Sequence, residues 1–444
     1  MAQNFLACDR EQAYLMPPSL RDWLPADELA WCVLDAVAEM DLSAIYAGYR
    51  ADGHGRAAHD PAMMVALLLY AYAVGERSSR GIERRCRADV AFRVIAANQA
   101  PDHATIARFR VRHQNALGEL FGQVLGVCAR AGLVSVGVIA LDSTKMAANA
   151  SGLQNRTYEQ IAAEILAEAD AVDAAEDALF GERRGDELPA ELADPTSRRA
   201  RLREAKRQLD AEHQAAEQAH REQLQERAKR EAELGRKLGG RKPKPPGERV
   251  DPQARMNVTD LDSRSVRTPR GFIQGYNAQA VATADQIIIA ADVIVGGTDQ
   301  GLLEPMIHAA VAELAAAGID LDIDVALADA GYWKGEQIQN LWAAGIQALI
   351  PPDGAADGQG KGDPRRGGGL YDYMRRVLAS EHGKTRYRQR GRTIEPIFGQ
   401  TKYNRRADRF QRRGRAACRS EWRLITATHN LLKYWRAAWT PAAA

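Results

Sequence analysis

The chain has 444 residues, of which 45% are hydrophobic and 27% charged, and its 60 basic residues nearly balance 58 acidic ones. This length corresponds to roughly three average domains, and the composition is that of a folded protein, not a disordered or fibrous one. The sequence has no run of about 18 apolar residues, so we expect no membrane span, and we expect no secretory signal at the start. Five scattered cysteines without a CxxC pair argue against a disulfide framework or a zinc site and fit a reducing cytoplasm.

The first 130 residues have the pattern of an all-α domain. Asp60 and Pro61 are residue types favoured at the start of a helix, and the apolar run after them suits a buried one. Asp102 is placed to cap a later helix whose exposed side is expected to carry polar and basic residues. These are Thr105, Arg108, Arg110 and Arg112. The layout resembles a helix-turn-helix, so we expect residues 1–130 to be a helical DNA-binding domain; an ordinary helical bundle is the alternative.

The pattern changes at Leu133. LVSVGVIALD has the composition of a buried central strand, which we expect to end at Asp142 and to be followed by a polar turn. From about Asn155 to Lys237 the chain is helical again, but charged and with few apolar positions, so it should project into solvent as a helical hairpin. A Gly/Pro/Lys-rich linker follows. Residues 152–250 are therefore expected to be a charged helical insertion and linker.

Strands and helices alternate after the linker. GFIQGYNAQAVAT and QIIIAADVIV predict a β-hairpin, and GLLEPMIHAAVAELAAAG predicts an amphipathic helix ending at Gly318. A strand leading to Asp329, a helix, a short strand and two helical patterns complete the chain. Without the insertion, this is the order of elements in an RNase H-like domain. The expected fold class is therefore α/β, with an RNase H-like mixed-sheet catalytic core in residues 131–151 and 251–444.

Three acidic residues stand out in this arrangement. Asp142 lies on the first strand, Asp329 just past the fourth, and Glu395 near the start of a late helix. Three such carboxylates could hold two Mg²⁺ ions about 3.5–4 Å apart, because hard oxygen ligands suit Mg²⁺. For each of them alone, a helix cap, a turn or a structural ion pair is the alternative. The nine histidines form no HxH or HExxH motif, which argues against a zinc enzyme.

A basic surplus surrounds the third acid. Twelve basic residues lie between Lys384 and Arg415, opposed only by Glu395 and Asp408. Such a local excess is typical of a protein with a polyanion partner, which here would be DNA. We expect Arg405 and Arg406 to follow the phosphate backbone, and a solvated charged helix is the alternative.

Two further groups have open roles. Tyr276, Asn277 and Gln279 in the GYNAQ segment either touch DNA or satisfy neighbouring backbone groups. Trp333 either stacks on a flipped base or packs in the core, and we favour packing.

Five blocks of the chain, in this order, resemble bacterial insertion-sequence transposases of the DDE type, in the branch with a Tyr-Arg-Glu-Lys signature. The blocks are residues 50–110, VIALDSTKMAANAS, VTDLDSRSVRTPRGFIQGYNAQAVAT, ALADAGYW and YRQRGRTIEPIFGQTK. The resemblance implies that Asp142, Asp329 and Glu395 form a metal-binding catalytic triad. It further implies DNA-contacting roles for the signature residues. These are Tyr387, Arg390 and Lys402, with Arg392 an alternative to Arg390 because four residues, one more than usual, separate Arg390 from Glu395.

The resemblance also implies an activity. The protein would bind the ends of its insertion element, cleave a phosphodiester there with two Mg²⁺ ions (or Mn²⁺), and join the 3′-OH ends to target DNA. We expect a homodimer that binds DNA and no membrane, located in the cytoplasm and on the nucleoid when bound. The alternatives are a non-catalytic, domesticated DNA-binding protein and an RNase H-like nuclease that cuts specific DNA structures without joining them.

Overall fold

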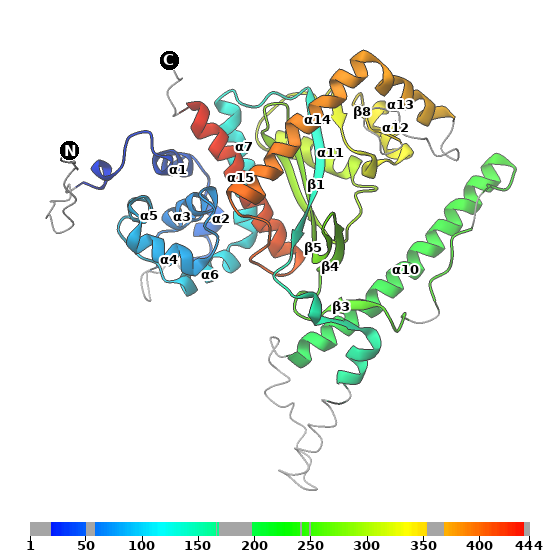
Figure 1. Cartoon of the computed structure of the whole chain (residues 1–444), viewed down its shortest axis with the longest axis horizontal. Coiled ribbons are helices and arrows are strands. Elements are labelled where there is room, and N and C mark those ends of the chain that lie inside the picture. Colours follow the sequence, from blue (N-terminus) through cyan, green and yellow to red (C-terminus); the bar gives the residue numbers. More distant parts are fainter. Residues whose placement is uncertain are drawn as a thin grey trace, which may run out of the picture.

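The computed structural model of the chain describes residues 19–49, 58–165, 167, 198–239, 242–247, 250–352 and 368–438. Every element described between residues 20 and 130 is a helix (Figure 1). These are the 3₁₀ helix η1 (Leu20–Trp23) and α1 (Leu29–Ala38), α2 (Ser43–Tyr46), α3 (Pro61–Ala73), α4 (Ser79–Ala88), α5 (Val90–Ile95), α6 (His103–Arg112) and α7 (Gln114–Arg130). That residues 1–130 form a separate domain remains a prediction.

The starts of α3 and α6 follow from their sequence. The Asp60 carboxylate accepts a hydrogen bond from the Ala62 N–H, and Pro61 occupies the first turn, where its missing N–H costs nothing. Asp102 caps α6 by accepting from the Thr105 N–H at 2.8 Å. Both predicted caps are confirmed, and α3 is buried along nearly its whole length, as its apolar run predicts.

A six-stranded mixed sheet occupies the centre of the molecule. Its strands are β1 (Val138–Ala147), β4 (Arg264–Thr268), β5 (Gly271–Thr283), β6 (Ile288–Ile294), β7 (Val325–Leu327) and β8 (Gln347–Leu349). The order is β4-β5-β1-β7-β8, with β6 also pairing with β5. The β5–β6 pair is the predicted hairpin, while β7 runs parallel to β1 and β8 parallel to β7. The fold is therefore α/β with a mixed sheet, in agreement with the predicted class.

The first strand is longer than its sequence predicts. The expected end at Asp142 is wrong, because β1 continues to Ala147 and pairs with β5 from Ile139 onward. The polar residues after Asp142 remain extended, since a long partner strand supplies hydrogen bonds to their backbone. Asp142 consequently lies within the strand and not at its end.

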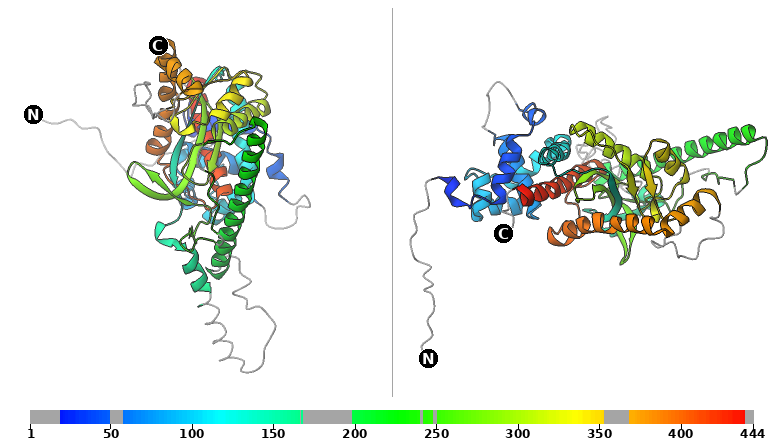
Figure 2. Two further views of the ribbon diagram at one scale, coloured as in Figure 1. Left: turned by 90° about the vertical axis from the view of Figure 1, so that its right-hand side faces the viewer. Right: turned by 90° about the horizontal axis from the view of Figure 1, so that it is seen from above.

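Helices cover both faces of the sheet. α11 (Leu303–Ala316) and α14 (Glu381–Gly399) lie on opposite faces, as the view from above shows (Figure 2). Gly318 follows α11 with a positive φ of 71°, as the sequence predicts for a residue just past a helix. The remaining helices of this part are the 3₁₀ helix η3 (Ala330–Tyr332), α12 (Gly335–Ala343), α13 (Gly369–Ala379), the π-helical turn η4 (Gln400–Asn404) and α15 (Arg415–Ala438).

The insertion forms a separate small unit. It contains η2 (Gly152–Gln154), the short antiparallel pair β2 (Asn155–Thr157) and β3 (Arg255–Asn257), a helical segment at 158–165, and the 37-residue helix α10 (Arg198–Leu234). Ile161, Leu202, Leu209 and Met256 belong to its own hydrophobic cluster. Beyond Leu209, α10 is mostly exposed and points away from the sheet (Figure 1), which confirms that the charged helix projects. The turn of the predicted hairpin lies outside the described residues.

One continuous hydrophobic core joins the N-terminal helices to the sheet. α15 lies between them and packs against α7, α3 and β6. No helix in the described part of the chain is long and apolar enough to cross a membrane.

Buried arginines reinforce this junction. Arg77 donates to the carboxylate of Glu421 at 3.0 Å and to the Arg409 and Arg406 carbonyls at 2.7 and 3.0 Å. Arg110 was expected on the exposed side of α6, and this is wrong: it is buried and donates to the Arg77 carbonyl at 2.8 Å. A buried guanidinium needs such acceptors, because an unpaired one would be costly.

Candidate active site

Three distant parts of the chain carry the three predicted acids, and Arg390 contacts two of them. Asp142 comes from β1, Asp329 lies two residues after the adjacent parallel strand β7, and Glu395 lies on α14. Arg390, one turn before Glu395, donates to Asp142 Oδ2 at 2.7 Å, and its other terminal nitrogen lies 3.6 Å from Glu395 Oε1. One guanidinium therefore contacts two of the three carboxylates.

The electrostatics of Asp142 reflect its burial. Loss of solvent raises the pKa of the Asp142 carboxyl to about 6, although Arg390 and the Ser143 N–H act to lower it. Asp329 is close enough that its negative charge adds to the increase in this pKa. Burial acts to lower the pKa of Arg390, but Asp142, Tyr387 and Asp329 together outweigh it and the pKa is raised. The carboxylates of Asp142 and Asp329 and the guanidinium of Arg390 therefore interact electrostatically in a partly desolvated site.

The other two acids are held by local structure. The Asp329 carboxylate accepts from the Gly331 N–H at 2.9 Å and so caps η3. Glu395 precedes Pro396 inside α14, and its side chain is 64% exposed. Pro396 lacks the N–H that would bond to the Arg392 carbonyl. The Gln286 side chain supplies that donor at 3.0 Å, which allows the helix to continue past the proline.

Of the two candidate signature arginines, Arg390 contacts the acids. Arg392 is exposed, and its carbonyl accepts the hydrogen bond from Gln286 described above.

Tyr387 is only 7% exposed and its hydroxyl donates to the Ala328 carbonyl at 3.3 Å. Burial raises the pKa of Tyr387 to about 12. The structure does not support the implied DNA contact of Tyr387, because its side chain is already covered by the protein.

Lys402 lies outside the regular helix that carries Glu395. α14 ends at Gly399, and Lys402 sits in the π-helical turn η4 that follows it. Its Nζ donates to the Lys145 carbonyl on β1 at 2.7 Å. Burial lowers the pKa of Lys402.

The carboxylates do not converge on one point. Within the described ranges, no group of three or more His, Cys, Asp or Glu side chains lies close enough to hold a metal ion. Arg390 contacts the carboxylate oxygens that a cation would otherwise approach. The donor set itself consists of hard carboxylate oxygens, which suits Mg²⁺ or Mn²⁺.

The predicted phosphate-binding arginines separate into two kinds. Arg405 is only 5% exposed, and its guanidinium donates to the Ile425 carbonyl and to the Thr428 and Thr401 hydroxyls at 2.8–3.0 Å. Its assignment to DNA phosphate is wrong, because it is enclosed between η4 and α15. Arg406, its neighbour, is exposed.

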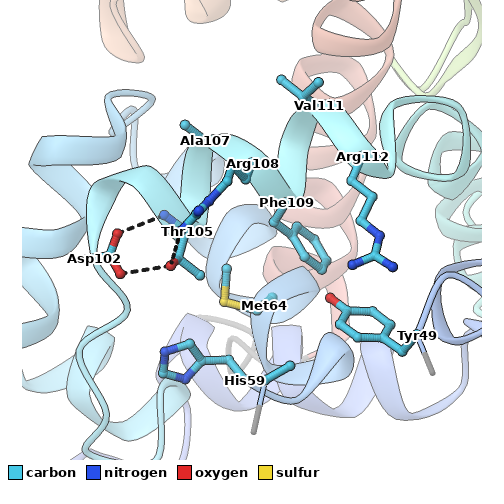
Figure 3. A pocket seen from close by; sticks show the side chains of 11 residues that line it. Tyr49, His59, Met64, Asp102, Thr105, Ala107, Arg108, Phe109, Val111 and Arg112 are labelled. Atoms are coloured by element: carbon cyan, nitrogen blue, oxygen red, sulfur yellow. Dashed lines mark hydrogen bonds between the residues drawn. The ribbon is translucent and has the colours of Figure 1, made fainter. Parts of the chain in front are cut away.

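Thr105 and Arg108 border a cavity of about 900 Å³ in the N-terminal helices (Figure 3). Arg108 is exposed, whereas the Thr105 hydroxyl is engaged with the Asp102 carboxylate at 2.8 Å. Arg112 also lines this cavity and covers the ring of Tyr49 at 4.7 Å from its centroid. The lining of this cavity is partly apolar and partly basic, and much of it comes from α6 in the predicted DNA-binding domain.

Trp333, Asn277 and Gln279, for which the sequence leaves a DNA contact or a structural role open, have structural contacts. Trp333 is buried and stacks on Tyr371 with ring centroids 4.7 Å apart, which confirms the packing role. Asn277 and Gln279 are fully buried, and both amide groups donate to the carboxylate of Asp299, at 2.7 and 2.8 Å. Sequence reasoning missed Asp299. The only signal was its position after a strand, which resembles that of Asp329.

Comparison with protein families gives two matches. Residues 18–112 match the family "Transposase domain (DUF772)", and residues 370–435 match the family "Transposase DDE domain". The second match spans α13 to α15 and so includes Glu395 and the signature residues around it, whereas Asp142 and Asp329 lie outside it. No curated protein and no solved structure matches the chain. Transposases act on DNA, and DDE domains generally use divalent metal ions. Both matches are to transposase families, and together they support an insertion-sequence transposase of the DDE type.

Proposed function

We propose that this transposase binds the ends of its insertion element, cleaves a phosphodiester there by metal-dependent hydrolysis, and joins the 3′-OH ends to target DNA. The observation that carries the proposal is the contact of Arg390 with Asp142 and Glu395, together with the closeness of Asp329 to Asp142, whose carboxyl pKa its charge helps to raise. Hydrolysis and joining are both in-line displacements at phosphorus, so a single site can serve both.

We also propose an RNase H-like core in residues 131–151 and 251–444. The order of the strands supports it: β1, β5 and β6 pair antiparallel in succession, and β7 and β8 then add in parallel on the other side of β1. Residues 152–250 would be the insertion and residues 1–130 the helical DNA-binding domain. The separate hydrophobic cluster supports a distinct insertion unit, and it extends just past residue 250 to Met256 and Val258.

In the proposed reaction, Asp142, Asp329 and Glu395 would hold two Mg²⁺ ions, or Mn²⁺. Such ions supply positive charge that activates the attacking oxygen and stabilises the leaving oxygen. Arg390 holds the carboxylates of Asp142 and Glu395 near each other. Tyr387 fixes the backbone just before Asp329 through the Ala328 carbonyl. Lys402 would offer its ammonium group to a DNA phosphate near β1.

Removal of divalent metal should abolish both reactions. We expect excess EDTA to stop cleavage of element ends and joining of pre-cut 3′-OH ends, and added Mg²⁺ or Mn²⁺ to restore them, because the ions would activate the attacking water or 3′-OH and stabilise the leaving oxygen. The measurement is a strand-transfer assay with labelled ends. Cleavage without joining would instead identify a structure-specific nuclease, and binding without either reaction a non-catalytic DNA-binding protein.

The exposed arginines after the third acid should contribute affinity without sequence preference. We expect Arg406→Ala with Arg413→Ala to weaken binding to cognate and random DNA alike, since phosphate contacts carry no direct sequence information. The log–log salt dependence should flatten by roughly two units, one for each lost contact. The measurement is a titration at several salt concentrations. Full affinity and slope together with a lost preference for element ends would contradict this assignment.

We propose a homodimer, because two element ends must be joined in one event.

Sequence preference would reside in the N-terminal helices, where Arg108 is exposed beside the cavity of Figure 3. Arg108→Ala should therefore change the ratio of affinities for cognate and random DNA more than it changes the salt dependence.

A further inference from the structure

Behind the proposed site, a partly buried lysine is engaged in a polar network. Lys145 lies on β1 three residues after Asp142, and its Nζ donates to Asn277 Oδ1 at 2.8 Å, Ser143 Oγ at 3.2 Å and Asp299 Oδ2 at 3.4 Å. These three bonds use all the N–H groups of the ammonium. Alternation along β1 places Ser143 and Lys145 on the opposite face from Asp142.

Asp299 is the centre of this network. It follows β6, its side chain is 16% exposed, and its Oδ1 accepts from the amide groups of both Asn277 and Gln279. Asn277 and Gln279 stand directly opposite Lys145 and Ser143 in the β1–β5 register. The two oxygens of Asp299 thus accept three hydrogen bonds from the two central strands.

The network extends to the turn that carries Asp329. The amide group of Gln279 is oriented by Asp299, so its Oε1 faces the Tyr332 hydroxyl, which donates to it. Tyr332 is buried and is the last residue of η3, the turn that the Asp329 carboxylate caps. A side chain after β6 is therefore linked through two hydrogen bonds to the turn after β7.

This linkage is costly to break. The ammonium of Lys145 is nearly enclosed and has Asp299 as its charged partner, and removal of one partner of such a pair leaves an uncompensated charge. If the Asp299 carboxylate were lost, Gln279 could turn its amide over, and the Tyr332 hydroxyl would then lose its acceptor. Freed of this restraint, η3 could move, and Asp329 would move with it.

We propose that Asp299 is a positioning residue for the transposase reaction: it holds Lys145 against β1 and, through Gln279 and Tyr332, fixes the turn that places Asp329 beside Asp142. The inference rests on the proposed function, since positioning has meaning only if these acids bind metal. Asp299 acts through its neighbours, because its oxygens are already occupied by hydrogen-bond donors.

The test uses the full chain and Asp299→Asn, with Asp292→Asn as a matched control. Asp292 lies on β6 directly opposite Gln279, but its carboxylate pairs with Arg419 and Arg415 of α15 instead of with the network. For Asp299→Asn we expect cleavage to fall about 10- to 100-fold and the Mg²⁺ concentration for half-maximal cleavage to rise about tenfold, as outer contacts of metal ligands typically produce. Direct Mn²⁺ titration by calorimetry, without DNA, should show the same weakening. Asp292→Asn should leave all three values near those of the wild type.

Folding is monitored by the melting temperature and by DNA affinity. A loss of cleavage proportional to the unfolded fraction, with an unchanged Mg²⁺ requirement and unchanged Mn²⁺ affinity, would overturn the proposal. If Asp299→Asn does not fold, Tyr332→Phe removes only the hydroxyl at the far end of the network. It should raise the Mg²⁺ requirement in the same direction, and a wild-type requirement would overturn the proposal.

The two hypotheses fail differently. If wild-type protein shows no metal-dependent cleavage, or if Asp142→Asn cleaves as well as wild type, the proposed function is wrong. If Asp142→Asn is inactive while Asp299→Asn and Tyr332→Phe behave as wild type, only the positioning role is wrong.

Discussion

Asp142→Asn should lower metal-dependent cleavage of element ends by about 10³-fold or more, and Asp329→Asn should do the same. The loss corresponds to the several kcal/mol of transition-state stabilisation that bound metal charge supplies. An asparagine keeps the shape of the side chain but cannot offer the negative charge that a divalent ion requires. The measurement is the single-turnover rate with pre-formed protein–DNA complex in Mg²⁺.

The matched control for this pair is Asp322→Asn. Asp322 is an exposed aspartate in the loop before β7, in the same part of the chain as Asp329. Its replacement should leave the rate unchanged, and all three variants should retain DNA affinity. Wild-type rates for either Asp142→Asn or Asp329→Asn would remove these residues from the proposed site.

Glu421→Ala should cost about 3–5 kcal/mol of unfolding free energy, because it removes the partner of a buried charge. Glu421 is 2% exposed, pairs with Arg77, and accepts the backbone N–H groups of Gln411 and Arg412 at 3.0–3.1 Å. The alanine would leave a buried guanidinium and two backbone donors without this acceptor. The measurement is urea denaturation at pH 7.

An exposed ion pair provides the comparison. Glu39 and Arg130 approach to 2.6 Å, but their side chains are 55% and 61% exposed. Glu39→Ala should change the unfolding free energy by less than about 1 kcal/mol, since solvent screens such a pair. A cost for Glu421→Ala as small as that of Glu39→Ala would show that the Arg77–Glu421 contact contributes little to the junction.

Local signals in the sequence predicted local structure well. The caps at Asp60 and Asp102 and the glycine after α11 depend only on residues a few positions apart, so they can be read from the chain. The end of β1 could not, because pairing with β5 decides it. Ser143 and Lys145 have polar side chains, yet their backbones remain in the ladder opposite Gln279 and Asn277.

The arginines illustrate a second limit. Arg110 and Arg405 look like exposed basic residues in the sequence, since arginine is rarely buried unless paired. Their acceptors are backbone carbonyls and hydroxyls that the fold supplies, such as the Arg77 carbonyl for Arg110 and Thr428 for Arg405. A charge count along the chain cannot separate Arg405 from Arg406.

The candidate site was predicted through resemblance more than through physics. Asp142, Asp329 and Glu395 are unremarkable aspartates and glutamates taken singly, and only the order of blocks selects them. Arg390 could not be separated from Arg392 by spacing, and its contact with Asp142 comes from the approach of α14 to β1. Asp299 carries no motif, so its contacts with β5 appear only once the strands are assembled.

The narrow base of the insertion has a consequence for how this chain can change. The insertion leaves and rejoins the core through the three-residue ladder of β2 and β3, where Asn155 faces Asn257. Between these neighbours, α10 alone extends about 55 Å at 1.5 Å per residue. Because its two ends are clamped side by side, the stretch between them can grow, shrink or be exchanged at an entropic cost that rises only with the logarithm of its length. Such changes need not disturb the packing of the core, so the β2–β3 pair is a suitable place to graft foreign domains onto the protein.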